Sequence, residues 1–295
     1  MAQRSSTGTA ATRPRPGKFM ANVYPREKFD LEELSRVAVE AAETASAALL
    51  ARFRPPAGVP LELNYKGPGD VVTDADLAAD RAIAQVLESR GAPGNLLSEE
   101  SSIDKGDSRL TWLIDPLCGT LPFSSGLPHW GVNVALSIGD ELEIGVVALP
   151  PSNEILSAVR GRGAYVNDVR LESQEPPGAP RNIAISFDAD GRRLTPAKRA
   201  LSEVFERLYG FASAAYPLGQ LLQGRLHGAV FNDLNVHTAA SVVIARELGV
   251  RVTDENGTDV MWASDSPSKY LVFAWPRTHE AMMESLRSLA TEPGG

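Results

Sequence analysis

The segment from Trp112 to Trp130, WLIDPLCGTLPFSSGLPHW, carries the strongest signal in the sequence. An apolar run that meets an acid, a proline and a Gly-Thr turn predicts a buried strand ending at the rim of a phosphate-handling site. The Gly119-Thr120 step can present backbone N–H groups to an anion. Cys118, the only cysteine of the chain, lies at the centre of this turn. A lone thiol therefore lies within a turn that is typical of an anion-binding site.

The composition predicts a globular protein with one large domain or two closely packed ones. The chain has 295 residues, of which 43% are hydrophobic and 22% charged, and its formal net charge is -8. An acidic surface repels phosphate backbones, so we expect no nucleic-acid partner. No apolar run is long enough to span a bilayer, so we expect no membrane partner. A single cysteine excludes an intrachain disulfide, which fits a cytoplasmic location.

The chain divides into a tail and two lobes. Residues 1–29 are rich in Ser, Thr, Ala, Pro and Arg without a periodic apolar face, so we expect a disordered basic tail. Residues 30–178 predict an α+β lobe that carries the site motifs. Residues 179–295, in which strand and helix patterns alternate, predict an α/β lobe that completes the cleft. The polar, Pro-rich segment 172–182 is the predicted boundary.

Helices and strands are predicted from apolar periodicity and turn residues. Asp30 and Glu33 form a predicted capping box, and Thr73 is the predicted cap of the second helix. Gly139 and Asp140 predict the turn of a hairpin. The expected helices span 30–53, 73–91, 196–210, 237–249 and 278–290, and the expected strands lie within 61–72, 95–101, 112–117, 131–150, 153–171, 183–187 and 270–275.

Three acidic stretches end at turn signals and supply candidate metal ligands. They contain Asp76 in DVVTDAD, Glu99 in SEES and Asp115 in IDPLCGT. Hard divalent cations need several carboxylate oxygens, which strand-end turns can bring together. Each acid also has an ordinary explanation, since Asp76 could be a first-turn acid favoured by the helix dipole and Glu99 a solvated loop charge.

In this order, the stretches resemble the inositol monophosphatase family of magnesium-dependent, lithium-sensitive phosphomonoesterases. DVVTDAD resembles the family's Asp-x-Val-Thr-x-x-Asp element, and SEES its Gly-Glu-Glu element. DPLCGT and VHTAAS resemble Asp-Pro-(Ile/Leu)-Asp-Gly-Thr and Trp-Asp-x-Ala-Ala-Gly. The resemblance covers about residue 30 to about residue 285. It implies a layered αβαβα sandwich with its active site between the lobes, and a homodimer.

The resemblance implies a role for each matching residue. Glu99, Asp115 and the carbonyl of Leu117 would hold a first magnesium ion. Asp76 and Thr120 would orient the attacking water.

The remaining matches concern the phosphate and a second magnesium ion. Lys66 corresponds to an active-site lysine, and Gly119 and Thr120 would contact the substrate. The second ion would need Asp115 and two further acids, but these two positions hold Cys118 and His237. The chain is thus expected to be a divergent member that binds one magnesium ion at most.

Other departures concern the substrate. His227 occupies a position where many members have Asp, and Val230 and Phe231 lie where inositol-specific members carry an acid that grips the polyol. Myo-inositol phosphate is therefore not the expected substrate, and we expect the approach to the site to be altered.

The double replacement predicts the loss of ordinary multi-magnesium hydrolysis. A phosphate dianion enters a carboxylate-lined pocket only because metal ions reverse its local sign. If Asp76, Glu99 and Asp115 stay ionised with one magnesium ion at most, the site stays net negative.

Three hypotheses follow for the function. In the first, His237 activates Cys118 as a nucleophile, Asp115 orients the imidazole, and a small polar or anionic metabolite undergoes acyl transfer, condensation or cyclisation without a metal. In the second, the protein is a sugar or cyclitol phosphate phosphatase that uses one magnesium ion, or a zinc ion held by Asp115, Cys118 and His237. In the third, it binds a ligand without turnover. The Arg- and Ala-rich composition suggests a bacterial source and a role in specialised metabolism.

Overall fold

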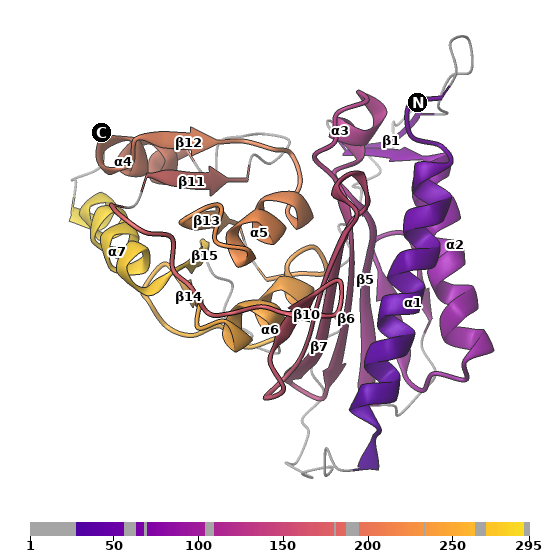
Figure 1. Cartoon of the computed structure of the whole chain (residues 1–295). Helices are drawn as coiled ribbons and strands as arrows, with labels where there is room; N and C mark the ends of the chain where they lie inside the picture. Colours follow the sequence, from indigo (N-terminus) through magenta and orange to yellow (C-terminus); the bar gives the residue numbers. More distant parts are fainter. Residues whose placement is uncertain are drawn as a thin grey trace, which may run out of the picture.

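The computed structural model describes residues 28–55, 63–67, 70–103, 109–179, 181–186, 195–232, 234–262 and 270–291. Within these residues, layers of helix and sheet alternate (Figure 1). One helix pair covers an eight-stranded sheet, a second pair lies between that sheet and a five-stranded sheet, and a third pair covers the outer face. The predicted αβαβα sandwich is confirmed. No helix among the described residues is long and apolar enough to cross a membrane.

The outer helix pair consists of α1 (Leu31–Leu50) and α2 (Asp74–Ser89). The Asp30 carboxylate caps α1, accepting bonds from the N–H groups of Glu32 and Glu33. The predicted return bond from Glu33 is not formed, because its carboxylate binds Arg36. The second predicted cap is confirmed: the Thr73 side chain caps α2.

The large sheet has the strand order β10-β9-β8-β7-β6-β5-β3-β4. The predicted hairpin is confirmed, with Gly139 at φ +59° in its turn. The segment 153–171 forms three strands rather than the two expected. The strands of this sheet are β3 (Asn95–Ser98), β4 (Ser102–Ile103), β5 (Leu110–Cys118), β6 (Gly131–Ile138), β7 (Glu141–Leu149), β8 (Glu154–Val159), β9 (Ala164–Val166) and β10 (Val169–Arg170). Four elements lie outside it. They are the two-stranded ribbon of β1 (Leu63–Gly67) and β2 (Asp70–Thr73) and the short helices α3 (Thr120–Ser124) and η2 (Pro150–Ser152).

The small sheet has the order β12-β11-β13-β15-β14. The helix expected over 196–210 ends at Val204, and Arg207–Tyr209 forms an edge strand instead. Strand β14 was not predicted. The elements are β11 (Asn182–Ile185), α4 (Thr195–Val204), β12 (Arg207–Tyr209), α5 (Ala215–Leu222), β13 (Gly228–Phe231), α6 (Ala239–Glu247), β14 (Arg251–Asp254), β15 (Leu271–Ala274) and α7 (Pro276–Thr291).

The middle helix layer brings the two sheets together. Its core combines residues of both sequence halves, such as Leu149 from β7 and Leu218 from α5. Gly219 allows this contact, because a Cβ atom at this position would lie 2.6 Å from the Leu149 side chain. The layer directs the starts of α5 and α6 towards the end of β5. Three chain segments therefore meet at the predicted site.

Candidate functional site

A bulge at the end of β5 brings Asp115 and Cys118 to the same place. Residues three apart in a regular strand point to opposite faces of a sheet. Here Asp115 pairs with Asn133 and Cys118 with Gly131, so one extra residue is accommodated between the two pairs. Pro116, which lacks an N–H group for the ladder, lies within the bulge. The carboxylate and the thiol therefore share one environment.

The Cys118 side chain is buried and well supplied with contacts. Its Sγ accepts the N–H groups of Ala214 and Ala215 at 3.1 and 3.2 Å, at the start of α5. The Ser213 hydroxyl donates to the Cys118 carbonyl at 2.8 Å. Burial raises the pKa of the Cys118 thiol, and the charge of Asp115 raises it further, against the effect of His237 and the N–H donor. The thiol is therefore neutral at neutral pH.

His237 precedes α6 and pairs with the buried acid. Its Nδ1 lies 2.7 Å from Oδ2 of Asp115 and 3.8 Å from Oε2 of Glu99. Burial acts to lower the pKa of His237, but the attraction of Asp115, reinforced by Glu99, raises it well above 6.5. The side chain keeps 34% of its surface exposed, which reduces the cost of carrying a charge. The contact with Asp115 therefore favours the imidazolium form of His237.

Asp115 is fully buried and stays ionised. Burial acts to raise its pKa, but the charge and hydrogen bond of His237 outweigh this, so the pKa of Asp115 lies below its ordinary value. One ligand atom each from Asp115, Cys118 and His237 lies within 4.8 Å of the other two. We call these residues the Asp-Cys-His cluster. The sequence-based expectation that Cys118 and His237 are neighbours agrees with this geometry.

Asp76 and Thr120 also meet, as expected for a pair that orients water. Oδ2 of Asp76 accepts the Thr73 N–H at 2.8 Å and its hydroxyl at 2.6 Å, which completes a capping box. Oδ1 accepts the Thr120 hydroxyl at 2.9 Å. Burial raises the pKa of Asp76, against the effect of these bonds. The helix cap and the candidate water-binding group are thus one carboxylate.

The residues expected to hold a first cation include a buried carboxylate. Oδ1 of Asp115 is buried and has no hydrogen-bond partner within the described part of the chain. A buried carboxylate oxygen without a partner is costly, and a bound cation would satisfy it. The Glu99 N–H donates to the Ile114 carbonyl, which aligns the end of β3 with β5, and the Leu117 carbonyl oxygen lies 3.3 Å from the Thr120 hydroxyl oxygen. Glu99, Asp115 and Leu117 therefore remain candidate ligands of one hard cation.

A second hard cation does not fit the cluster. Sγ of Cys118 is a soft ligand that already accepts two N–H groups, and Nδ1 of His237 is paired with Asp115. A zinc ion bound by both Nδ1 of His237 and Oδ2 of Asp115 would require these atoms to move apart, because two ligands at tetrahedral angles about zinc lie roughly 3.3 Å apart. The 2.7 Å separation between His237 Nδ1 and Asp115 Oδ2 is that of a direct ion pair.

Gly119 connects the cluster to the neighbouring loops. Its φ of +110° is unfavourable for other residues, and a Cβ atom there would lie 2.9 Å from the His129 carbonyl oxygen and 3.0 Å from Ser213 Cβ. The turn that carries Thr120 is therefore tightly fixed. Ser213, Ala214 and Ala215 were not predicted as site residues. The sequence feature that could have identified them is a run of small residues at the start of a helix, where backbone N–H groups have no partner within the helix.

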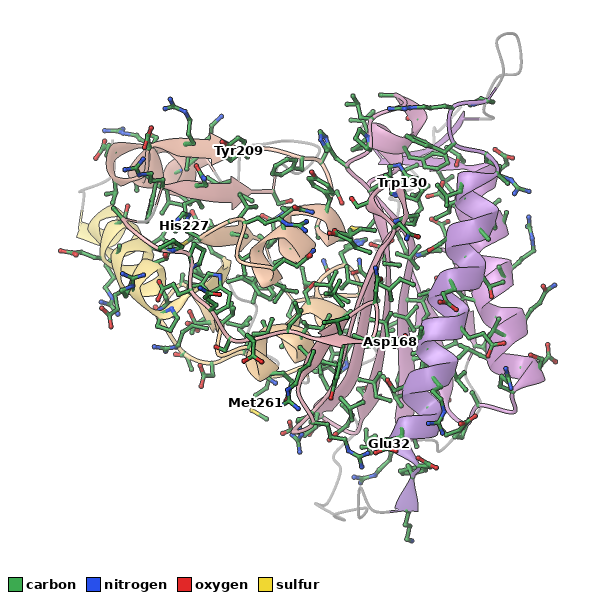
Figure 2. All side chains as sticks on the ribbon, in the orientation of Figure 1. Glu32, Trp130, Asp168, Tyr209, His227 and Met261 are labelled. Atoms are coloured by element: carbon green, nitrogen blue, oxygen red, sulfur yellow. The ribbon has the colours of Figure 1, made fainter. Side chains whose placement is uncertain are left out.

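Other predicted residues lie elsewhere. Lys66 is part of β1, and its side chain is outside the described residues. His227 begins the turn into β13, where its Nδ1 accepts the Asn182 N–H at 3.4 Å. Figure 2 shows it on the small-sheet side, away from Trp130. The segment that carries His237 follows the opposite end of β13. His227 and His237 therefore lie beyond opposite ends of β13, and the expected alteration of the approach to the site stays a prediction.

The charge of His237 enters the charge balance of the site. The prediction from the sequence took three carboxylates and one magnesium ion and left out His237. If Asp76, Glu99 and Asp115 are all counted as carboxylates, three negative charges face the one positive charge of His237. A single divalent cation then brings the site to neutrality. A phosphate dianion is not repelled by such a site.

Comparisons with known proteins agree on one family. A profile described as "Inositol monophosphatase family" matches residues 30–291. Nus factor SuhB from Pasteurella multocida (strain Pm70) is 34% identical over 236 residues, 77% of this chain and 86% of that protein. The crystal structure of extragenic suppressor protein suhB from Bartonella henselae has a TM-score of 0.78 at 26% identity, covering 86% of this chain and 98% of that one. An IMPase/NADP phosphatase complexed with Mg²⁺ and phosphate shares the fold, with a TM-score of 0.72, 17% identity and coverage of 90% and 98%.

Proposed function

The chain belongs to the inositol monophosphatase family, whose members depend on metal ions, and we propose that it hydrolyses small phosphomonoesters with a single divalent cation. In this proposal the His237 side chain supplies the positive charge of a second magnesium ion. The observation that carries it is the 2.7 Å contact between His237 Nδ1 and Asp115 Oδ2, beside a carboxylate oxygen that has no partner within the described residues.

Electrostatics supports the exchange of an ion for a side chain. The reference is a site that has all its acids. Relative to it, two carboxylates are replaced by a neutral thiol and an imidazolium. The loss of the two acids raises the net charge by two units, and the imidazolium raises it by one more. Omitting one divalent cation lowers the net charge by only two units. The remaining site is therefore no more negative than a site with all its acids and both ions. Phosphate binding does not require the second ion.

Glu99, Asp115 and the Leu117 carbonyl would hold the one magnesium ion. When bound, this ion would polarise the phosphoryl group as a Lewis acid. The His237 imidazolium would lie on the other side of the Asp115 carboxylate and attract the phosphate oxygens. The backbone of the Gly119-Thr120 turn would hold the phosphate through its N–H groups.

Asp76 and Thr120 would place the attacking water. The Thr120 hydroxyl donates a hydrogen bond to Asp76, so the lone pairs of its oxygen can accept a hydrogen bond from water. Burial raises the pKa of Asp76, which makes this carboxylate a better proton acceptor than an exposed one. The two hydrogen bonds from Thr73 keep the acceptor in place. The alcohol released from the ester takes up a proton at the open side of the site.

The test is phosphate release from a panel of small phosphomonoesters by the full chain. We expect turnover with added Mg²⁺ and none with a chelator. His237→Gln keeps a polar side chain but removes the cation, and should lower kcat/KM roughly 100-fold. The control is His279→Gln, which lies in α7 outside the cluster and should retain activity. Unchanged activity in His237→Gln would overturn the proposal.

One observation favours a second candidate, which is thiol chemistry. The N–H groups of Ala214 and Ala215 point at Cys118 Sγ, as donors do that stabilise a thiolate. His237 would then act as the base, and an activated carbonyl in a small metabolite would be the target. Cys118→Ser distinguishes the candidates, because it should abolish acyl chemistry and leave phosphate release largely intact. Burial and the raised pKa of the thiol place this candidate second.

The substrate and assembly follow from the same proposal. A small phosphorylated metabolite is the expected partner, within a homodimer in the cytoplasm. The relatives named Nus factor SuhB carry a name that implies other partners. The formal charge of -8 does not favour a nucleic-acid partner for this chain. A binding role without turnover would be favoured instead if a phosphate analogue raised Tm while no ester was consumed.

A further inference from the structure

Four aromatic side chains pack against one another next to the Asp-Cys-His cluster. The His129 ring centroid lies 5.4 Å from that of Phe211 and 4.8 Å from that of Tyr216, and the last two lie 5.2 Å apart. Tyr209 stacks on Phe211, with centroids 5.9 Å apart and planes inclined by 19°. We call these four residues the ring cluster. His129 comes from the loop before β6 and the others from the segment 209–216, so the ring cluster joins the two lobes.

The ring cluster is directly connected to the site. The carbonyl of His129 and the side chain of Ser213 are the two groups that a Cβ atom at Gly119 would strike. The Ser213 hydroxyl donates to the Cys118 carbonyl and accepts the Tyr216 N–H at 3.3 Å. The same short loops therefore hold both the phosphate-binding turn and the rings.

The rings are not fully buried. Tyr209 is 38% exposed at the end of β12, and Figure 2 shows it at the edge of the small sheet. His129, Phe211 and Tyr216 are half-buried. Ala212, between Phe211 and Ser213, has a φ of +50°, a conformation that costs about 1 kcal/mol for a residue with a Cβ atom. Partly exposed rings held by a strained backbone are more typical of a binding surface than of a core.

We propose that the ring cluster binds the alcohol part of the substrate, and that this part carries an aromatic or heteroaromatic ring. This inference rests on the proposed function, because the phosphate group fixes the ligand at the Gly119-Thr120 turn. A planar ring attached to that phosphate would reach the adjacent side chains of Phe211 and Tyr209. Aromatic faces attract such rings by stacking and edge contacts, whereas polyol hydroxyls would lose hydrogen bonds there.

The test uses phosphonates, which cannot be hydrolysed and so measure binding alone. Phenylphosphonate and methylphosphonate share the phosphate-like group and differ in the ring. By calorimetry with the full chain and Mg²⁺, we expect phenylphosphonate to bind roughly tenfold more tightly. Tyr209→Leu and Phe211→Leu should each lower this ratio severalfold and leave methylphosphonate binding unchanged. Tyr209→Leu alters an exposed residue and should fold normally.

The matched control is Tyr165→Leu, which removes a half-buried ring from β9 in the large sheet and should preserve the ratio. Equal affinity for the two phosphonates, or an unchanged ratio in both ring variants, would overturn the inference. If the preference is found but no phosphomonoester is hydrolysed, the proposed function fails and the ring site stands. If neither phosphonate binds, both fail.

Discussion

The imidazole Nδ1 of His237 lies 2.7 Å from Oδ2 of Asp115, although 122 residues separate them in the sequence. Asp115 is fully buried, and this contact gives its carboxylate a fixed positive partner. The pair therefore replaces part of what a metal site does, since it neutralises an acid that folding has removed from water. In the proposed function, the chain carries its own cation where its family resemblance would place an ion.

Restoring the two acids should restore the second metal site. In Cys118→Asp/His237→Asp, two carboxylates would join buried Asp115 and the imidazolium would be lost. Without metal, we expect the free energy of unfolding to fall by about 3 kcal/mol or more, because uncompensated buried charges are costly. Mg²⁺ should recover most of that loss, and calorimetry should detect one more ion than in the wild type. A variant as stable without metal as the wild type would show that these positions do not face Asp115.

The thiol of Cys118 should be unreactive in the native protein. Its residue is 4% exposed and burial raises its pKa, so both access and the thiolate fraction are low. We expect labelling by a disulfide reagent at pH 7 to be at least about 100-fold slower in the folded chain than in urea. Because there is no other cysteine, the signal reports this residue alone. Rapid native labelling would favour the thiol candidate over the phosphatase.

Replacing Ala212 by glycine should stabilise the protein. Ala212 has a φ of +50°, and removing its Cβ atom relieves the strain of that conformation. The gain is reduced by the greater freedom of glycine in the unfolded chain, so we expect a net change of about 0.5 kcal/mol. Urea unfolding of Ala212→Gly measures it. The control is Ala214→Gly, whose parent has an ordinary φ of -94° and which should lose stability.

The sequence was sufficient for the architecture and for the neighbours of Cys118. The family resemblance predicted the order of the layers. The helix cap at Thr73 and the turn at Gly139 depend on neighbouring residues only, so the sequence was enough to predict them. Local pattern failed at Arg207–Tyr209, where a helical periodicity continues into a residue run that pairs with β11. That pairing is a tertiary contact, which a local pattern does not contain.

The charge of His237 could not be predicted from sequence either. It depends on a 2.7 Å contact with a fully buried acid, and hence on the middle helix layer that directs α6 towards β5. The bulge around Pro116 and the N–H groups of Ala214 and Ala215 likewise arise from packing. The sequence identifies these residues, but their protonation states depend on distances that only the structure gives.

Acid should weaken the fold through His279, which lies in α7 and is 3% exposed. Its Nε2 lies 2.8 Å from the Thr253 hydroxyl. Burial, with help from Arg251, lowers the pKa of His279 from 6.5 to about 4. Below pH 6.5 the unfolded chain takes up a proton at this residue that the folded chain refuses until about pH 4. Its stabilising contribution is therefore complete above pH 6.5 and is lost between these two values.

Over that interval His279 should cost the wild type up to about 3 kcal/mol of unfolding free energy. His279→Gln keeps a hydrogen-bonding group for Thr253 but does not titrate, so its stability should fall less between pH 6.5 and 4. Urea midpoints measured across this range for both proteins give the difference directly, because the carboxylates that titrate there are common to them. Glu284→Gln, an exposed change in the same helix, should follow the wild-type curve. Parallel curves of stability against pH for wild type and His279→Gln would mean that the imidazole is already protonated in the folded state. The ring would then donate the hydrogen bond to the Thr253 hydroxyl.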